Sequence, residues 1–145
     1  MPFPVSLVLP PMITGLDHIS IAVEDLDGSV RLWQAVAQAQ VVGRERVPEQ
    51  QVEVVMLKIG ALKIELIYPT SENSSVAKFL ASRGPGLHHI ALECESAQAE
   101  LDRLRQAGVQ LIDESARAGA EHSHVGFVHP KSLSGVLVEF VDHAG

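Results

Sequence analysis

The stretch GLHHIALEC at residues 86–94 decides the fold, because a similar stretch, GLDHISIAV, occurs at residues 15–23. Each stretch begins at a glycine, carries a histidine at its fourth position, and continues with the alternation of a β-strand. Aligning His18 with His89 gives an offset of 71 residues, about half of the 145-residue chain. A repeat of this size predicts two units of the same kind, each beginning with this strand.

The same order of predicted elements follows each stretch. A strand over 16–23 precedes an amphipathic helix over 27–38, and a strand over 88–94 precedes a helix over 96–107. Gly108 follows the second helix, where a C-terminal glycine is common. Further strands are expected at 44–49, 52–59 and 62–68 in the first unit and at 109–112, 124–128 and 136–141 in the second.

This order predicts an α+β domain of two βαβββ modules, whose strands form one curved mixed sheet around a cleft. Module one spans 15–69, a linking helix lies within 70–85, and module two spans 86–143. The helices are too short and too few for a doubly wound sheet. Residues 1–14 are apolar with four prolines and lack the basic start of a secretory signal, so we expect an N-terminal extension before a single domain at 15–143.

Composition restricts the classes of function. Hydrophobic residues make up 46% of the chain, which suits a packed core, while the net charge of −7 without a basic cluster argues against nucleic acid as a partner. No apolar run reaches the roughly 20 residues of a membrane span, so no membrane partner is expected. The single cysteine, Cys94, excludes an internal disulfide framework and is predicted to be a buried apolar residue in a cytoplasmic protein.

The last strand of each module carries one glutamate among aliphatic residues. Glu65 follows His18 by 47 positions, and Glu139 follows His89 by 50. A buried carboxylate needs a compensating partner, and two imidazoles with one or two carboxylates suit a divalent ion with open positions for substrate. Taken singly, each residue could be a hydrogen-bonded core histidine or a solvated glutamate. The repetition of the pair favours a metal site.

The other histidines have no such repetition. Strand alternation predicts that His88 points away from the cleft that His89 faces. We expect the remaining four histidines to be surface or loop-structural residues, and the loop around Gly119 is a candidate lid. These four are His122, His124, His129 and His143.

Several segments together resemble the vicinal oxygen chelate superfamily and, within it, the methylmalonyl-CoA epimerases. They are DHISIAVEDLDGSV, VPEQQVEVVMLKIGALKIELIYP, GLHHIALE and HPKSLSGVLVEFV, which span most of the chain from residue 16 to residue 141. The resemblance implies paired βαβββ modules around a metal-binding cleft and a homodimer. It also implies one divalent ion per cleft, with Co²⁺ expected and Mn²⁺, Zn²⁺ or Ni²⁺ as alternatives. The implied metal ligands are His18, Glu65, His89 and Glu139.

The implied reaction interconverts (2R)- and (2S)-methylmalonyl-CoA in propionate metabolism. Metal chelation of the substrate oxygens stabilises the enolate formed when the C2 proton leaves, and epimerisation needs an acid/base on each face. Glu139 resembles one member of that pair. Some epimerases carry the other at the position of Val54, with Gln at the position of Glu65, so here Glu65 is predicted to act as ligand, base or both.

Basic and polar residues near these motifs are candidates for binding the acyl-CoA. We expect Gln50, Arg117 and Lys131 to contact substrate. Two other functions remain open at this point. A glyoxalase I-type lyase acting on a glutathione hemithioacetal would suit the same four ligands. A metal-free module that binds or sequesters a small molecule would not require them, and their retention argues against it.

Overall fold

The computed structural model describes residues 12–143, so the predicted extension lies outside it except for its last three residues. Module one contains β1 (Ile13–Ala22), α1 (Leu26–Ala37), β2 (Gln40–Val47), β3 (Val52–Ile59) and β4 (Leu62–Pro69). The helix α2 (Ser75–Arg83) joins it to module two, which contains β5 (Gly86–Cys94), α3 (Ala97–Gln106), β6 (Arg117–Ala118), β7 (His124–Val128) and β8 (Val138–Asp142). Three short 3₁₀ turns, η1 (Pro48–Gln50), η2 (Ala120–His122) and η3 (Pro130–Leu133), complete the described chain.

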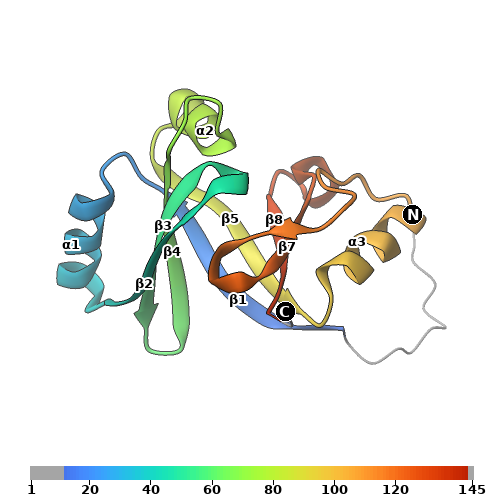
Figure 1. Ribbon diagram of the computed structural model, residues 1–145, viewed down its shortest axis with the longest axis horizontal. Helices are drawn as coiled ribbons and strands as arrows, with labels where there is room; N and C mark the ends of the chain where they lie inside the picture. Colours follow the sequence, from blue (N-terminus) through green and yellow to red (C-terminus); the bar gives the residue numbers. More distant parts are fainter. Residues whose placement is uncertain (1–11, 144–145) are drawn as a thin grey trace.

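The strands form one eight-stranded mixed sheet in the order β2-β3-β4-β1-β5-β8-β7-β6. The first strands of the modules, β1 and β5, lie side by side and antiparallel at its centre (Figure 1). Each then pairs in parallel with the last strand of its own module, β1 with β4 and β5 with β8. The predicted pair of βαβββ modules in one curved mixed sheet is therefore confirmed.

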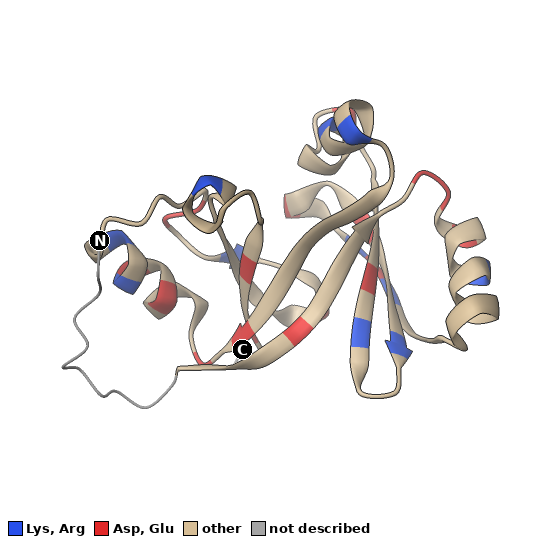
Figure 2. Ribbon diagram, turned by 180° about the vertical axis from the view of Figure 1, so that it is seen from behind, with Lys and Arg blue, Asp and Glu red and all other residues tan. Residues whose placement is uncertain are grey.

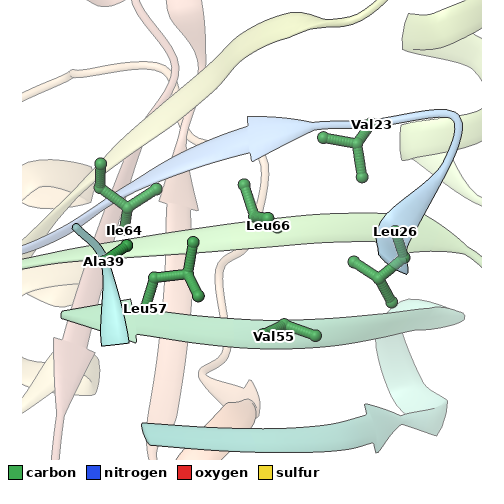
Figure 3. Packing of buried hydrophobic residues seen from close by; sticks show 7 residues of the cluster. All are labelled: Val23, Leu26, Ala39, Val55, Leu57, Ile64 and Leu66. Atoms are coloured by element: carbon green, nitrogen blue, oxygen red, sulfur yellow. The ribbon is translucent and has the colours of Figure 1, made fainter. Parts of the chain in front are cut away.

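Helices α1 and α3 cover the sheet face opposite to the glutamates. Side chains from α1, from the segments that flank it, and from β3 and β4 pack there in one cluster. It consists of Val23, Leu26, Ala39, Val55, Leu57, Ile64 and Leu66 (Figure 3). In module two, Leu101 of α3 is fully buried and lies so near Gly126 of β7 that a Cβ there would be 2.5 Å from Leu101 Cδ1. Because the helices take this face, the other face remains for a site.

One predicted strand is wrong. Residues 109–112 form no strand, and only Leu111 makes an isolated bridge, with Val128. The Asp113 carboxylate accepts a hydrogen bond from the Phe127 backbone N–H at 2.9 Å. This N–H of β7 therefore bonds to a side chain and not to the backbone of a neighbouring strand. The edge strand of module two is instead β6, at Arg117–Ala118.

Two further features bear on the expectations from composition. Cys94 is a free, buried thiol, as predicted. Within residues 12–143, no helix combines the length and the apolar character that crossing a bilayer requires.

Candidate active site

Strand pairing brings the two repeated histidines together. His18 on β1 lies opposite Ala91 on β5, and His89 on β5 lies opposite Ser20 on β1. Residues directly opposite on neighbouring strands share a face of the sheet, and so do residues two apart on one strand. The two imidazoles therefore lie on the same face, with ring centroids 5.8 Å apart.

The two glutamates occupy equivalent registers in the modules. Glu65 on β4 lies beside Ser20, and Glu139 on β8 lies beside Ala91. Because Ser20 and Ala91 are each two positions after a repeated histidine, the pairing reproduces the repeat at the level of single residues. All four predicted metal ligands are buried on one face, with exposed fractions of 4–7%.

The nitrogens and oxygens of these residues converge. The Glu139 Oε1 atom lies 3.5 Å from His18 Nε2 and 3.3 Å from His89 Nε2. One donor atom from each of His18, His89 and Glu139 lies within 4.8 Å of the others. The Glu65 Oε1 atom is 3.6 Å from His18 Nε2 and accepts a hydrogen bond from Ser20 Oγ at 2.7 Å. Glu65 therefore adjoins the group of three.

The donor set fits a divalent ion. His18 Nε2 is buried and has no hydrogen-bond partner, although its other ring nitrogen, Nδ1, lies 2.7 Å from the Asp17 carboxylate. The Nδ1 atom of His89 is likewise engaged, at 2.8 Å from His88 Nδ1. Histidine ligands of metals are commonly held in this way through the second ring nitrogen. Both Nε2 atoms are thus directed toward the carboxylates and suit coordination.

The electrostatics of the site favour a positive charge at its centre. Burial alone would lower the pKa of His18, but the hydrogen bond with Asp17 and the nearby Glu65 and Glu139 carboxylates raise it to about 10. Burial would raise the pKa of Glu65, but contact with His18 and Ser20 lowers it to about 2. The Glu65 carboxylate therefore stays ionised and favours a proton on His18, at a point where a bound divalent ion would bring its own positive charge.

The expectation that His88 points away from the cleft is wrong. Ser20 pairs with His89 while Ile21 pairs with Leu87, so His88 is the extra residue of a β-bulge. A bulge re-aims a side chain that strict alternation would place on the other face. The His88 ring lies against Phe79 of α2, at 4.9 Å between centroids, and lines the same cavity as His89.

Asp17 is the matching bulge residue on β1. Leu16 pairs with Leu92 while His18 pairs with Ala91, which leaves Asp17 unpaired beside His18. The Asp17 carboxylate also contacts His143 Nε2 at 2.8 Å. Two hydrogen-bonded neighbours thus hold this carboxylate beside His18.

Two cavities adjoin the convergent residues. The larger, of about 290 Å³, lies between η1, the start of α2 and module two, and its lining includes Gln50, Arg117, His88 and His89. The smaller, of about 10 Å³, is lined by His18, Glu65 and Glu139 and by the loop residues Ala120, Glu121 and Ser123. The loop around Gly119 therefore covers the carboxylates, which is the place expected of a lid.

The predicted substrate contacts are placed differently. Gln50 lines both cavities, and Arg117 lines the larger one, 3.2 Å from Asp113. Lys131 lies exposed on η3 and lines neither cavity. The structure thus brings Gln50 and Arg117 to the cleft and leaves Lys131 outside it.

Sequence reasoning missed two neighbours of the predicted ligands, Ser20 and Asp17. The signal for Ser20 was present, since a residue two positions after His18 shares its face of a strand. Asp17 gave no such signal, because it reaches His18 only through the bulge. Of the remaining histidines, His122 and His124 are exposed, and His129 accepts the Lys131 backbone N–H at the start of η3, in keeping with surface or structural roles.

Comparison with known proteins identifies the family to which this fold belongs. Residues 17–127 match the model of the Glyoxalase/Bleomycin resistance protein/Dioxygenase superfamily. The ethylmalonyl-CoA/methylmalonyl-CoA epimerase of Cereibacter sphaeroides is 36% identical over 130 residues, which cover 88% of this chain and 97% of that protein.

Solved structures give the same result. The methylmalonyl-CoA epimerase of Mycobacterium tuberculosis superposes with a TM-score of 0.89 at 36% identity, over 96% of this chain and 94% of that one. A methylmalonyl-CoA epimerase in complex with methylmalonyl-CoA and NH₄⁺ superposes with a TM-score of 0.86 at 39% identity, over 92% and 96%. The chain therefore belongs to the Glyoxalase/Bleomycin resistance protein/Dioxygenase superfamily, also called the vicinal oxygen chelate superfamily, and within it to the methylmalonyl-CoA epimerase family.

Proposed function

We propose that the protein interconverts (2R)- and (2S)-methylmalonyl-CoA by removing and returning the proton at C2. The observation that carries this proposal is the convergence of two buried imidazoles and two buried carboxylates beside a cavity of about 290 Å³. The related epimerases, one of them solved with methylmalonyl-CoA, support the choice of substrate.

The metal would be held by His18, His89 and Glu139, with Glu65 beside them. A bound divalent ion supplies electrophilic stabilisation of the negative charge that develops on the thioester oxygen when C2 loses its proton. Co²⁺ is the proposed ion, with Mn²⁺, Zn²⁺ and Ni²⁺ as alternatives for a site of imidazole and carboxylate donors. Asp17 and His88 orient the two imidazoles through their Nδ1 atoms.

The two glutamates are proposed to move the proton. Epimerisation needs an acid/base on each face of the planar enolate. Glu65 on β4 and Glu139 on β8 flank the central strands β1 and β5 from opposite sides, which suits one glutamate per face. Val54 is buried and apolar, so the position that carries a glutamate in some epimerases offers no base here.

The acyl-CoA is proposed to enter through the larger cavity. Gln50 supplies an amide at the junction of the two cavities, and the Arg117 guanidinium supplies a positive charge for the substrate carboxylate. For Lys131 the exposed position on η3 leaves only the outer part of the CoA as a partner.

A second copy of the chain is the proposed macromolecular partner. Leu16 and Leu87 are 50% and 68% exposed on the central strands. Figure 2 shows these strands crossing the molecule between α1 and α3 with no helix over them. A homodimer interface over the central strands would remove the exposed Leu16 and Leu87 side chains from water. The cytoplasm is the proposed location, where the Cys94 thiol stays reduced.

Proton exchange tests the function directly. The protein is freed of metal, loaded with Co²⁺, and incubated with methylmalonyl-CoA in deuterated water, and mass spectrometry follows deuterium at C2. We expect exchange to accompany epimerisation, well above the rate of a control without protein. Turnover of a glutathione hemithioacetal without C2 exchange would instead identify a glyoxalase I-type lyase. Binding of the acyl-CoA without turnover, under any added divalent ion, would identify a binding module.

A further inference from the structure

A single hydroxyl breaks the equivalence of the two modules at the site. Ser20 and Ala91 occupy matching positions, beside Glu65 and Glu139 respectively, and both are fully buried. The Ser20 Oγ atom lies 2.7 Å from Glu65 Oε1 and 2.8 Å from His89 Nε2. Ala91 offers its glutamate no hydrogen bond. The two carboxylates therefore differ in the one neighbour that each finds on the adjacent central strand.

The direction of the hydrogen bond follows from the groups involved. An ionised carboxylate only accepts hydrogen bonds, and a serine hydroxyl has one proton to donate. Ser20 therefore donates to Glu65, and its oxygen faces His89 Nε2. A donor on a charged acceptor makes a short, strong bond, and the complete burial of Ser20 keeps water from replacing it.

This bond matches the separation of the donor atoms. Within residues 12–143, the group that converges to within 4.8 Å around His18 and His89 contains Glu139 and leaves Glu65 out. Glu139 Oε1 faces both Nε2 atoms, whereas Glu65 Oε1 faces the Ser20 hydroxyl at the shorter distance. The glutamate without a serine thus lies near both imidazoles, whereas the glutamate with a serine lies 3.6 Å from His18 Nε2 and is hydrogen-bonded to Ser20.

We propose that Ser20 is a positioning residue that withholds Glu65 from the metal, so that Glu65 stays available to the proton at C2 while Glu139 completes the donor set. This inference rests on the proposed function for the role of Glu65 at C2. The withholding itself is a property of the protein without substrate. It assigns different tasks to two glutamates that the repeat would otherwise make alike.

The test exchanges the hydroxyl between the modules. Ser20→Ala removes the hydroxyl donor and introduces the alanine that module two carries at the equivalent position, Ala91. Calorimetry measures Co²⁺ binding to the metal-free variant. We expect Ser20→Ala to bind Co²⁺ about tenfold more tightly, because Glu65 becomes free to coordinate, a change of about 1.4 kcal/mol. The same variant loses kcat about tenfold or more with KM nearly unchanged. Ser20→Thr keeps the hydroxyl and restores both values.

Ala91→Ser is the mirror variant. A hydroxyl beside Glu139 is expected to draw this carboxylate away and weaken Co²⁺ binding about tenfold. Weaker Co²⁺ binding by Ser20→Ala overturns the inference, because it would mean that Ser20 only supports the packing of the site. Unchanged Co²⁺ binding also overturns it, because Ser20 would then have no effect on the metal donors. If Ser20→Ala does not fold by circular dichroism, the direction of the change in Ala91→Ser decides.

The two proposals fail separately in this design. The Co²⁺ titrations contain no substrate, so they test the withholding of Glu65 alone. A wild-type protein that exchanges no C2 proton, together with tighter Co²⁺ binding by Ser20→Ala, would refute the epimerase and keep the assignment of Ser20. Active wild-type protein, together with weaker Co²⁺ binding by Ser20→Ala, would support the epimerase and refute the assignment of Ser20.

Discussion

Asp17 and His88 occupy equivalent bulge positions in the two modules, and each contacts Nδ1 of the histidine that follows it. The distances are 2.7 Å from Asp17 Oδ2 to His18 and 2.8 Å from His88 Nδ1 to His89. The same backbone irregularity therefore presents a carboxylate to one imidazole and a second imidazole to the other. A carboxylate raises the basicity of a ligand histidine more than a neutral ring does, so the proposed metal would be bound unequally by the two modules.

Removing the charge of Asp17 tests this difference. We expect Asp17→Asn to weaken Co²⁺ binding by about 10–100-fold, because an amide orients His18 without adding basicity. Calorimetry on the metal-free variant measures the change. His143→Gln is the matched control, since His143 contacts Asp17 without contacting His18, and it is expected to change binding by less than about threefold. Equal losses of Co²⁺ affinity in the two variants would show that the charge of Asp17 does not determine metal binding by His18.

The placement of the glutamates on opposite sides of the central strands predicts a stereochemical split. Glu65→Gln and Glu139→Gln should each slow epimerisation by about 10²–10⁴-fold, the usual contribution of an acid/base group. Glu65→Gln should still exchange the C2 proton of one enantiomer, because Glu139 serves one face. Glu139→Gln also changes a proposed metal donor, so it should exchange the C2 proton of the other enantiomer only at saturating Co²⁺. Deuterium incorporation started from pure (2R) or (2S) substrate measures this. Equal loss of exchange from both enantiomers would contradict one glutamate per face.

The backbone of the loop over the small cavity predicts a gain in stability. Glu121 and His122 have φ of 58° and 56°, in the left-handed region that costs a residue with a Cβ about 1–2 kcal/mol. His122→Gly should stabilise the fold by about 0.5–1 kcal/mol, after the larger entropy of glycine in the unfolded chain is subtracted. Urea unfolding measures it. Glu121→Gly is the comparison, because it also removes the ion pair with Lys63 at 3.3 Å and should gain less.

Close packing of α3 on the sheet predicts a loss of stability when Gly126 is replaced. Gly126→Ala places a methyl group against Leu101 and should cost about 1–3 kcal/mol of unfolding free energy, the usual range for overpacking. Gly43→Ala on the edge strand β2 is the control, since a Cβ there meets nothing within 4 Å. Urea midpoints of the two variants compare them. A Gly126→Ala protein as stable as the wild type would show that Leu101 can move aside.

How far the sequence predicted the site depends on strand alternation. The repeat and the period of two were enough to place His18, His89, Glu65 and Glu139 on one face, because register and repeat agree residue by residue. The bulges could not be predicted, since an extra residue leaves no trace in a hydrophobic pattern.

Two other features were hidden from the pattern for different reasons. A lone serine in a strand carries no signal until its partner is known, which concealed Ser20. The apolar run at 109–112 has the composition of a strand. The hydrogen bond from the Phe127 backbone N–H to the Asp113 side chain, which takes the place of a backbone bond there, depends on tertiary contacts that the pattern does not show.

Burial of Cys94 gives a prediction about pH. Desolvation by burial, with the nearby Asp142 and Glu100 charges, raises the pKa of the thiol from 9.0 to about 12. The unfolded thiol ionises first as pH rises, so the stability that this group contributes is complete below pH 9 and is lost progressively between about pH 9 and 12. The urea midpoint should therefore fall at alkaline pH.

Cys94→Ala isolates that effect, because the variant keeps every other titrating group. Its urea midpoint should fall less than that of the wild type between pH 8 and pH 10.5, although its stability at pH 8 is lower through lost packing. In the folded wild type, iodoacetamide should label the thiol only after unfolding, since the thiolate is the reactive form. Rapid labelling of folded protein at pH 8 would mean that Cys94 is reached by solvent and that its thiol ionises near the ordinary value.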